Sequence, residues 1–287
     1  MKNLVFFCDS CADLTYELIE KNKLEVIIMP VYLDGEEYTI DYKNKGDFAD
    51  LIESLKAKKK PTTAAISTQN YIDIFEPHLK AGKDCIYVSF SHGLTDSFLY
   101  MAKAVEELEE KYKGRKIHLA DTKSVCGGTG LLVLQAVAMW QSGATAEQIV
   151  KFVEGASNHT TMMFYVDDLG HLKRGGRISA TTAAVGGMLN VKPILQCEGK
   201  LEKCGKANGT KKAIRFLFDK FVENFEPAKD APVFIVDANV KQNADTLYNL
   251  VIDFVKDRSE VLKVPIGPTV MAHCGLGTVG IAYNRKK

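Results

Sequence analysis

Short apolar runs alternate along this chain with longer segments in which every third or fourth residue is apolar. Such runs are typical of buried strands, and the wider spacing is typical of helices that pack one face on a sheet. The pattern predicts strands at residues 4–7, 24–31, 84–90 and 116–120, and helices at 16–21, 47–55, 69–79, 97–112, 130–140 and 146–153. This alternation favours an α/β fold whose sheet is mainly parallel and flanked by helices.

The pattern indicates a domain boundary near residue 158. Gly143 follows one predicted helix, and Thr145 with Gln148 forms a capping box for the last helix before the boundary. Beyond it we expect strands at 160–166, 232–236 and 269–273, helices at 179–189, 210–225 and 245–255, and a hairpin turn at Glu198-Gly199. The sequence therefore predicts two α/β domains, residues 1–158 and 159–287, with a ligand cleft between them.

Composition narrows the class of protein. The chain has 287 residues, 46% of them hydrophobic and 25% charged, so it can bury a sizeable core. A formal net charge of +1 and the lack of a dense basic face argue against nucleic-acid partners. Seven scattered cysteines favour reduced thiols in a cytoplasmic protein. The first apolar run ends at Cys8, too early for a signal sequence, and no stretch is long enough to span a bilayer.

Four polar stretches fall at predicted strand ends or helix starts, where folds present side chains to ligands. They contain Thr63, Thr95, Arg177 and His273. The two threonines belong to the predicted first domain and the other two residues to the second, so we expect all four to converge at the cleft. Two hydroxyls, an imidazole and a guanidinium suit a small anionic head group. The sequence therefore predicts a carboxylate-binding clamp.

These positions also have purely structural interpretations. Asp96, beside one of the threonines, either repels an anion or, as we favour, caps the following helix. Arg177 could instead hold the carboxylate of Asp167 or Asp168. His273 ends a predicted apolar strand, where a histidine is often a core residue, and loop hydroxyls often form local turn bonds.

Longer motifs occur in a fixed order from end to end. They are Asp9-Ser10-x-x-Asp13-Leu14, Lys-x-Thr-Thr, the Gly-Leu-Thr loop, Asp121-Thr122-Lys123-Ser124, Leu172-x-x-Gly-Gly-Arg-Ile-Ser, Lys192-Pro193-Ile194 and His273-x-Gly-x-Gly-x-x-Gly280. In order and spacing they resemble the DegV family. The resemblance implies a two-domain α/β fold with a buried acyl chain, carboxylate contacts at Thr63, Thr95 and His273, and Arg177 close to the head group. The chain departs from the usual pattern at residues 64–66 and at Asp96.

The family is similar to the FakB subunits of bacterial fatty acid kinase systems. The resemblance therefore implies a non-enzymatic carrier, without cofactor or metal, that binds a palmitate-like fatty acid and presents its carboxylate to a separate kinase. Burial of about fifteen methylenes at roughly 0.8 kcal/mol each is worth on the order of 12 kcal/mol, so the tail supplies affinity and the clamp supplies direction. We expect the tail to be lined by Phe164, Ala184, Val185, Met188, Leu189 and Ile194. The departures leave another apolar carboxylate open as the ligand.

A redox role is one alternative. Cys8-x-x-Cys11 follows a predicted strand and precedes a helix, the setting of many thiol-disulfide sites, although the neighbouring Asp9 disfavours a thiolate. The lysine-rich run at residues 56–60 adds a second open question, since it is either a solvated loop or a contact for an acidic partner or membrane surface.

An acyl hydrolase is the other alternative. Thr95 or Ser91 would be its nucleophile and His92 or His273 its base, but no Gly-x-Ser-x-Gly motif is present. Two glycine-rich segments do not match nucleotide motifs, because residues 127–130 lack the P-loop lysine and residues 275–280 lack a following helix. The six histidines show no metal-binding pair at helical spacing.

Overall fold

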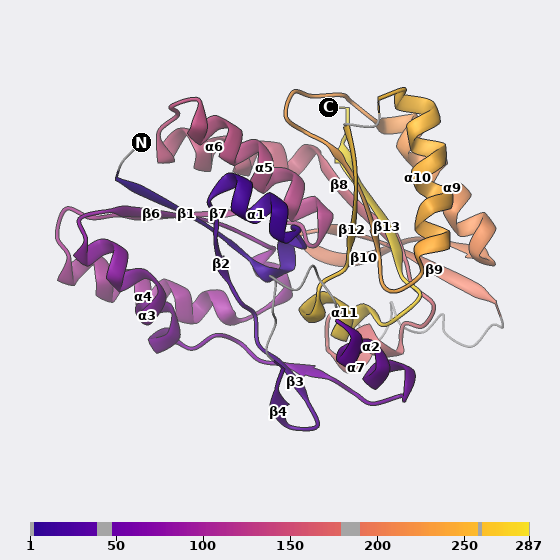
Figure 1. Ribbon diagram of the computed structural model, residues 1–287, viewed down its shortest axis with the longest axis horizontal. Helices are drawn as coiled ribbons and strands as arrows, with labels where there is room; N and C mark the ends of the chain where they lie inside the picture. Colours follow the sequence, from indigo (N-terminus) through magenta and orange to yellow (C-terminus); the bar gives the residue numbers. More distant parts are fainter. Residues whose placement is uncertain (1–2, 39–47, 179–189, 258–259, 287) are drawn as a thin grey trace.

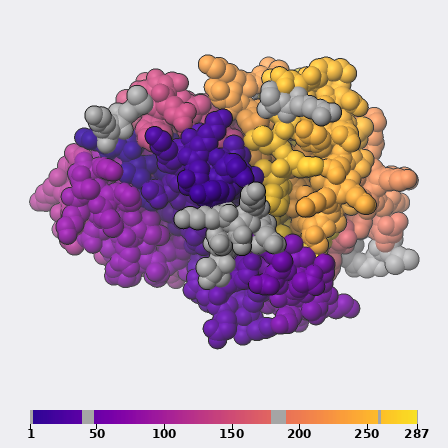
Figure 2. Space-filling view, viewed as in Figure 1, coloured from indigo at the N-terminus to yellow at the C-terminus, as the bar shows by residue number. Residues whose placement is uncertain are grey.

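Two main sheets of different construction lie next to each other in this computed structural model, which describes residues 3–38, 48–178, 190–257 and 260–286 (Figure 1). In the view of Figure 2, most of the N-terminal half of the chain lies on the left and most of the C-terminal half on the right. The predicted α/β class is confirmed.

The first sheet is parallel, as predicted. Its strand order is β2-β1-β6-β7, with bounds Glu25–Ile27, Leu4–Asp9, Asp84–Ser89 and Ile117–Asp121. Figure 1 shows α3 and α4 below this sheet and α5 and α6 above it, with bounds Thr68–Lys80, Ser97–Lys111, Gly127–Gln141 and Ala146–Ala156. The short helix α1, Tyr16–Asn22, follows the 3-10 turn η1, Ser10–Ala12. The capping box of Thr145 and Gln148 is present at the start of α6.

The second sheet has six strands in mixed orientation. Their order is β10-β9-β8-β13-β11-β12, with bounds Lys200–Asn208, Val191–Glu198, Thr160–Tyr165, Val279–Asn284, Val233–Asp237 and Val261–Pro265. Side chains alternate between its faces, because successive strand residues point to opposite sides. Met162 and Phe164 pack in the core shared with α5, whereas Met163 and Tyr165 pack with α9, Thr210–Asn224, and α10, Lys241–Val255. The predicted hairpin turn is confirmed at Gly199, between β9 and β10.

Several short elements lie near the junction of the two sheets. A small sheet has the order β4-β3-β5, with bounds Glu36–Glu37, Val31–Leu33 and Thr62–Thr63. The helices here are α2, α7 and α11, with bounds Ala49–Lys56, Gly170–Arg174 and Pro268–Cys274. Two further 3-10 turns are η3, His92–Leu94, and η4, Ser157–His159. The part of the chain that the structure describes contains no helix long and apolar enough to cross a membrane.

Two predictions of secondary structure need correction. Residues 269–273 are not a strand but most of α11, which begins with Pro268 in its first turn and packs on β3 and β5. A seven-residue apolar segment has too few turns for its periodicity to decide between helix and strand. The predicted strand 24–31 is divided into β2 and β3, and the strands β12 and β13 were missed. The helix predicted at 179–189 lies outside the described residues.

Candidate functional site

Thr63 and His273 meet at the junction of the two sheets. Thr63 ends β5, and His273 lies on α11, which packs against that strand. The Oγ1 atom of Thr63 is 2.8 Å from Nε2 of His273. Two residues that are 210 positions apart in the chain therefore form one hydrogen-bonded unit.

The protonation of His273 decides what this pair can offer a ligand. Burial, with a further contribution from the charge of Arg177, lowers the pKa of His273 to about 4. The imidazole is therefore neutral at pH 7 and has one N–H. With that proton on Nε2, His273 donates to Thr63, and the Thr63 hydroxyl is free to donate its own proton to a carboxylate.

The hydroxyl of Thr95 can also donate its proton to a ligand. Its Oγ1 accepts a hydrogen bond of 3.1 Å from the backbone N–H of Ser97, the first residue of α4, so its hydroxyl proton is available to a ligand. Asp96 occupies the N-cap position of α4, but its side chain makes no capping hydrogen bond. The expectation that Asp96 caps this helix was therefore wrong in its chemistry, because Thr95 supplies the acceptor.

Arg177 braces the loops around the two threonines. Its Nε donates to the carbonyl oxygen of Leu94 at 3.2 Å, and Nη1 donates to the carbonyl oxygen of Gly175. The alternative in which it holds Asp167 or Asp168 is not what the structure shows. Asp167 pairs with Lys192 at 2.7 Å, and Asp168 accepts from the backbone of Gly170 at 2.7 Å. These two bonds use two of the five N–H groups of the guanidinium.

An apolar pocket reaches inward from these residues. Thr63, Thr95, Arg177 and His273 all line it. The remaining walls are mostly apolar side chains from both sheets, among them Phe90, Val125, Met162, Phe164 and Leu201. The structure thus brings the four predicted residues to one pocket, while their contact with a carboxylate remains a prediction.

A polar groove lies on the outer side of the same residues. Thr63, Arg177 and His273 line both the groove and the pocket, and Lys60, His171 and Arg174 also line the groove. The three shared residues therefore mark the place where an apolar interior meets a positively charged mouth.

The residues predicted to line the acyl tail differ in whether they border the pocket. Phe164 lines the pocket, as expected. Ile194 does not, because its position on β9 turns its side chain to the opposite face of the sheet, where it packs with Met163 and Tyr165. Residues 184, 185, 188 and 189 lie outside the described residues. Residues of the N-terminal half, including Cys11 and Cys126, also line the pocket, and they were not predicted because a sequence motif does not show which core residues border a cavity.

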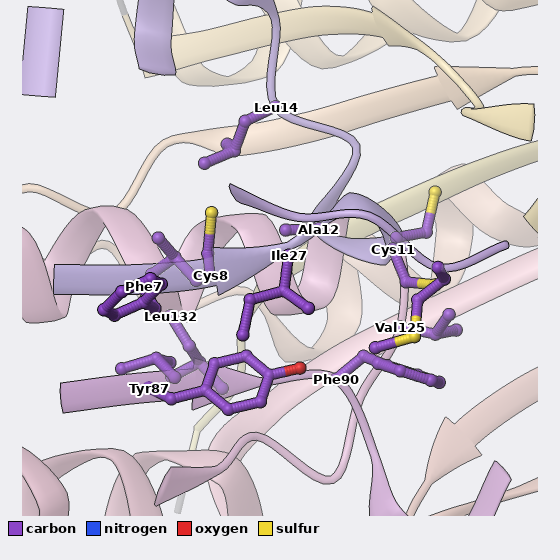
Figure 3. Close-up of a cluster of buried hydrophobic side chains, with 14 of the residues drawn as sticks. Phe7, Cys8, Cys11, Ala12, Leu14, Ile27, Tyr87, Phe90, Val125 and Leu132 are labelled. Atoms are coloured by element: carbon purple, nitrogen blue, oxygen red, sulfur yellow. The ribbon is translucent and has the colours of Figure 1, made fainter. Parts of the chain in front are cut away.

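The redox alternative is not favoured by the surroundings of Cys8 and Cys11. Both thiols are buried, and Figure 3 shows that they do not point toward one another. Burial, assisted by the negative charge of Asp9, raises the pKa of both thiols well above its ordinary value. All seven cysteines are free.

The hydrolase alternative also lacks its expected pairs. Ser91 Oγ donates to the carbonyl oxygen of Gly199 at 2.5 Å rather than to a histidine. His92 instead contacts Ser89 at 3.0 Å and lies 3.8 Å from Asp121, but Ser89 is 1% exposed and also donates to a backbone carbonyl. The hydroxyl of Ser89 is therefore not accessible to a substrate. Among the described residues, no group of His, Cys, Asp or Glu is arranged to hold a metal ion.

Comparison with known proteins identifies the family. The family model described as "Uncharacterised protein, DegV family" matches residues 4–286. A DegV domain-containing protein of Clostridium perfringens is 32% identical over 287 residues, covering 99% of this chain and 98% of that protein. Among solved structures, DegV of Bacillus subtilis, a fatty acid binding protein, is 26% identical with a TM-score of 0.81 over 99% of both chains. A fatty-acid-binding DegV family protein of Thermus thermophilus is 24% identical, with a TM-score of 0.84 over 98% of this chain and 99% of that one. This chain therefore belongs to the DegV family.

Proposed function

We propose that this protein binds a long-chain, palmitate-like fatty acid with its tail in the apolar pocket and its carboxylate at Thr63, Thr95 and His273. The observation that carries this proposal is the position of the Thr63–His273 pair, 2.8 Å apart, where the apolar pocket meets the polar groove. The fatty acid binding of the Bacillus and Thermus relatives supports the same ligand class.

The clamp meets the physical requirement of a carboxylate that is partly removed from water. Such a group needs hydrogen-bond donors for its lone pairs. The Thr95 hydroxyl oxygen accepts a hydrogen bond from the backbone N–H of Ser97, and the Thr63 hydroxyl oxygen can accept one from Nε2 of His273. Each hydroxyl can therefore donate its own proton to the carboxylate of the ligand. The guanidinium of Arg177, which also lines the pocket, adds a positive charge near the proposed position of the carboxylate.

We further propose that the protein is a carrier and that phosphorylation of the bound acid belongs to a separate, ATP-dependent kinase. In this arrangement the carboxylate lies at the polar groove, where an outside enzyme can reach it. The nearby lysines at 56–60 would meet an acidic surface of a partner or membrane, and Lys60 itself lines the groove.

Extraction of the purified protein with organic solvent, followed by mass spectrometry, tests the proposed ligand. We expect about one long-chain fatty acid per chain in the parent protein and its loss in a Thr63→Ala/Thr95→Val double variant. Thr246→Val is a matched control, because this exposed hydroxyl on α10 only donates to the backbone of Gln242.

The proposal would be contradicted if the purified parent protein contained no fatty acid and took up none when fatty acid was added. Recovery of a different apolar carboxylate would support the proposed clamp but would contradict the proposed identity of the ligand. The carrier role is tested separately by adding a bacterial fatty acid kinase and ATP, with acyl phosphate expected only when the loaded carrier is present.

A further inference from the structure

Ser97 is a buried polar residue between the two segments that carry the clamp threonines. It is the first residue of α4 and is 0% exposed. Its backbone N–H donates to Oγ1 of Thr95 at 3.1 Å, and its side-chain Oγ accepts from the backbone N–H of Ile66 at 3.0 Å. Ile66 follows Thr63 closely in the chain. One residue therefore contacts both of the segments that carry the clamp hydroxyls.

A second hydrogen bond joins the same two segments at the surface. Oγ1 of Thr68, the first residue of α3, donates to the carbonyl oxygen of Tyr100 at 3.2 Å. This bond is exposed to water, whereas the bond to the Ser97 side chain is buried. Water can replace an exposed bond but not a buried one, so the Ser97 bond has the larger effect on how the segments are placed. Residues 64–66 and Asp96, where the chain departs from the usual family pattern, adjoin this buried contact.

Tyr71 holds the hydroxyl of Ser97 in place. Oη of Tyr71 is 3.0 Å from Oγ of Ser97, and both residues are 0% exposed. Because the serine oxygen already accepts a bond from Ile66, its own proton is available to Tyr71. The hydroxyl of Tyr71 also interacts with that of Tyr87, which donates to Oδ2 of Asp9 at 3.0 Å. The direction of the serine hydroxyl is therefore fixed by a group of buried polar side chains.

A carboxylate makes a stricter geometric demand on its site than a head group with one oxygen. Its two oxygens accept bonds from donors at a matching separation, whereas an alcohol needs only one partner. Thr63 and Thr95 lie on different segments, so the separation of their hydroxyls depends on how these segments contact one another. The buried bonds of Ser97 hold that separation before a ligand binds, and such preorganisation raises affinity.

We propose that Ser97 is a positioning residue that makes the clamp selective for a carboxylate over an uncharged head group with one oxygen. Its hydroxyl and its backbone N–H place Thr63 and Thr95 relative to each other, and Tyr71 orients the serine hydroxyl. Ser97 acts through the threonines, since it is buried and is not among the residues that line the pocket. The inference rests on the proposed function, because it requires the carboxylate to lie at both threonines.

The ratio of the affinities for palmitic acid and for the alcohol of the same chain length tests this role. Both are measured by displacement of a fluorescent fatty acid, whose own affinity is first determined for each variant. We expect Ser97→Ala to lower the affinity for the acid by roughly 10-fold and that for the alcohol by less than about 2-fold. Tyr71→Phe, which removes only a hydroxyl, lowers the ratio by about 3-fold. The control is Ser157→Ala, where a buried hydroxyl of η4 donates to the carbonyl oxygen of Glu154 at 2.8 Å, and it leaves the ratio unchanged.

The ratio separates positioning from a general loss of structure, because a variant that only loosens the fold weakens acid and alcohol alike. An equal loss for the two ligands, or an unchanged ratio in Ser97→Ala, overturns the positioning role and leaves fatty acid binding intact. Failure of the parent protein to bind the acid overturns the proposed function as well. Melting curves show which variants fold, and if Ser97→Ala does not, an unchanged ratio in Tyr71→Phe overturns the inference.

Discussion

At the scale of the residue, the proposed clamp requires His273 to be uncharged and close to Thr63. His273→Ala removes the group that orients the Thr63 hydroxyl, and hydrogen bonds to a charged ligand are worth about 1.5–3 kcal/mol. We therefore expect fatty acid affinity to fall by roughly 10- to 100-fold, measured by displacement of a fluorescent fatty acid. His159→Ala, in the 3-10 turn before β8, is the control. Equal binding by the two variants would remove His273 from the clamp.

Asp9 provides a test of buried charge at the same scale. It accepts hydrogen bonds from Tyr87 Oη and from the backbone N–H groups of Phe90 and Cys11, yet burial outweighs these bonds and raises its pKa to about 7. Since its ordinary value is 3.8, the folded state holds the proton more tightly than the unfolded state between pH 4 and 7. This group's contribution to stability is therefore present at low pH, falls as the pH rises through that window, and is lost above pH 7.

The corresponding variant is Asp9→Asn, whose side chain cannot titrate. We expect the melting temperature of the variant to decrease less than that of the parent between pH 5 and pH 8. Only the window from pH 5 to the folded pKa of about 7 contributes in this range, so two pKa units at about 1.4 kcal/mol each set an upper bound on the order of 3 kcal/mol for the difference in unfolding free energy. Asp73→Asn, at an exposed position of α3 where Gln69 donates to the carboxylate, is the control. Identical pH profiles for Asp9→Asn and the parent would contradict the assignment.

At the scale of the element, sequence patterns predicted the long helices and the parallel sheet because each presents several turns or a continuous apolar run. They did not predict α11, since its seven residues from Pro268 to Cys274 are mostly apolar and too few to show a helical period, and the helix packs against β3 and β5. His273 was therefore expected at a strand end and instead lies on a helix. Thr63 and His273 came from motif resemblance, because local periodicity does not show which distant residues meet at one pocket.

The β9–β10 hairpin offers a prediction at this scale. Its tip lies so close to the η3 turn that a Cβ atom at Gly93 would stand 2.3 Å from the carbonyl oxygen of Gly199. Gly93→Ala must displace the hairpin, which carries the pocket residue Leu201. We expect a loss of about 1–3 kcal/mol in stability, together with weaker fatty acid binding, by denaturant unfolding and ligand displacement. The control is Gly155→Ala in α6, where a Cβ meets no atom within 4 Å and alanine should be neutral or stabilising. Unchanged binding by Gly93→Ala would show that the hairpin does not shape the pocket.

At the scale of the whole molecule, the sheets share their core through α5. This helix is buried on nearly every side and contacts β6 of the first sheet and β8, β11 and β13 of the second. One apolar cluster accordingly includes Phe6 from the first sheet and Phe234 from the second. Local periodicity could predict each sheet, but the way they share a helix depends on contacts between distant segments, which the pattern of one segment does not contain.

The shared helix predicts how the protein unfolds. We propose that residues 1–158 and 159–287 are two domains by topology but one cooperative unit in stability, because removal of the second sheet would expose one side of α5 to water. The single tryptophan, Trp140, lies at the end of α5, where its ring packs against Phe6 of the first sheet, so its fluorescence reports on the first sheet. We expect its fluorescence and the far-UV circular dichroism of the whole chain to change at the same denaturant concentration, and a fragment of residues 1–158 to lack cooperative unfolding. Two separate transitions would instead mean that each sheet is stable without the other, and that the pocket between them can open without unfolding either one.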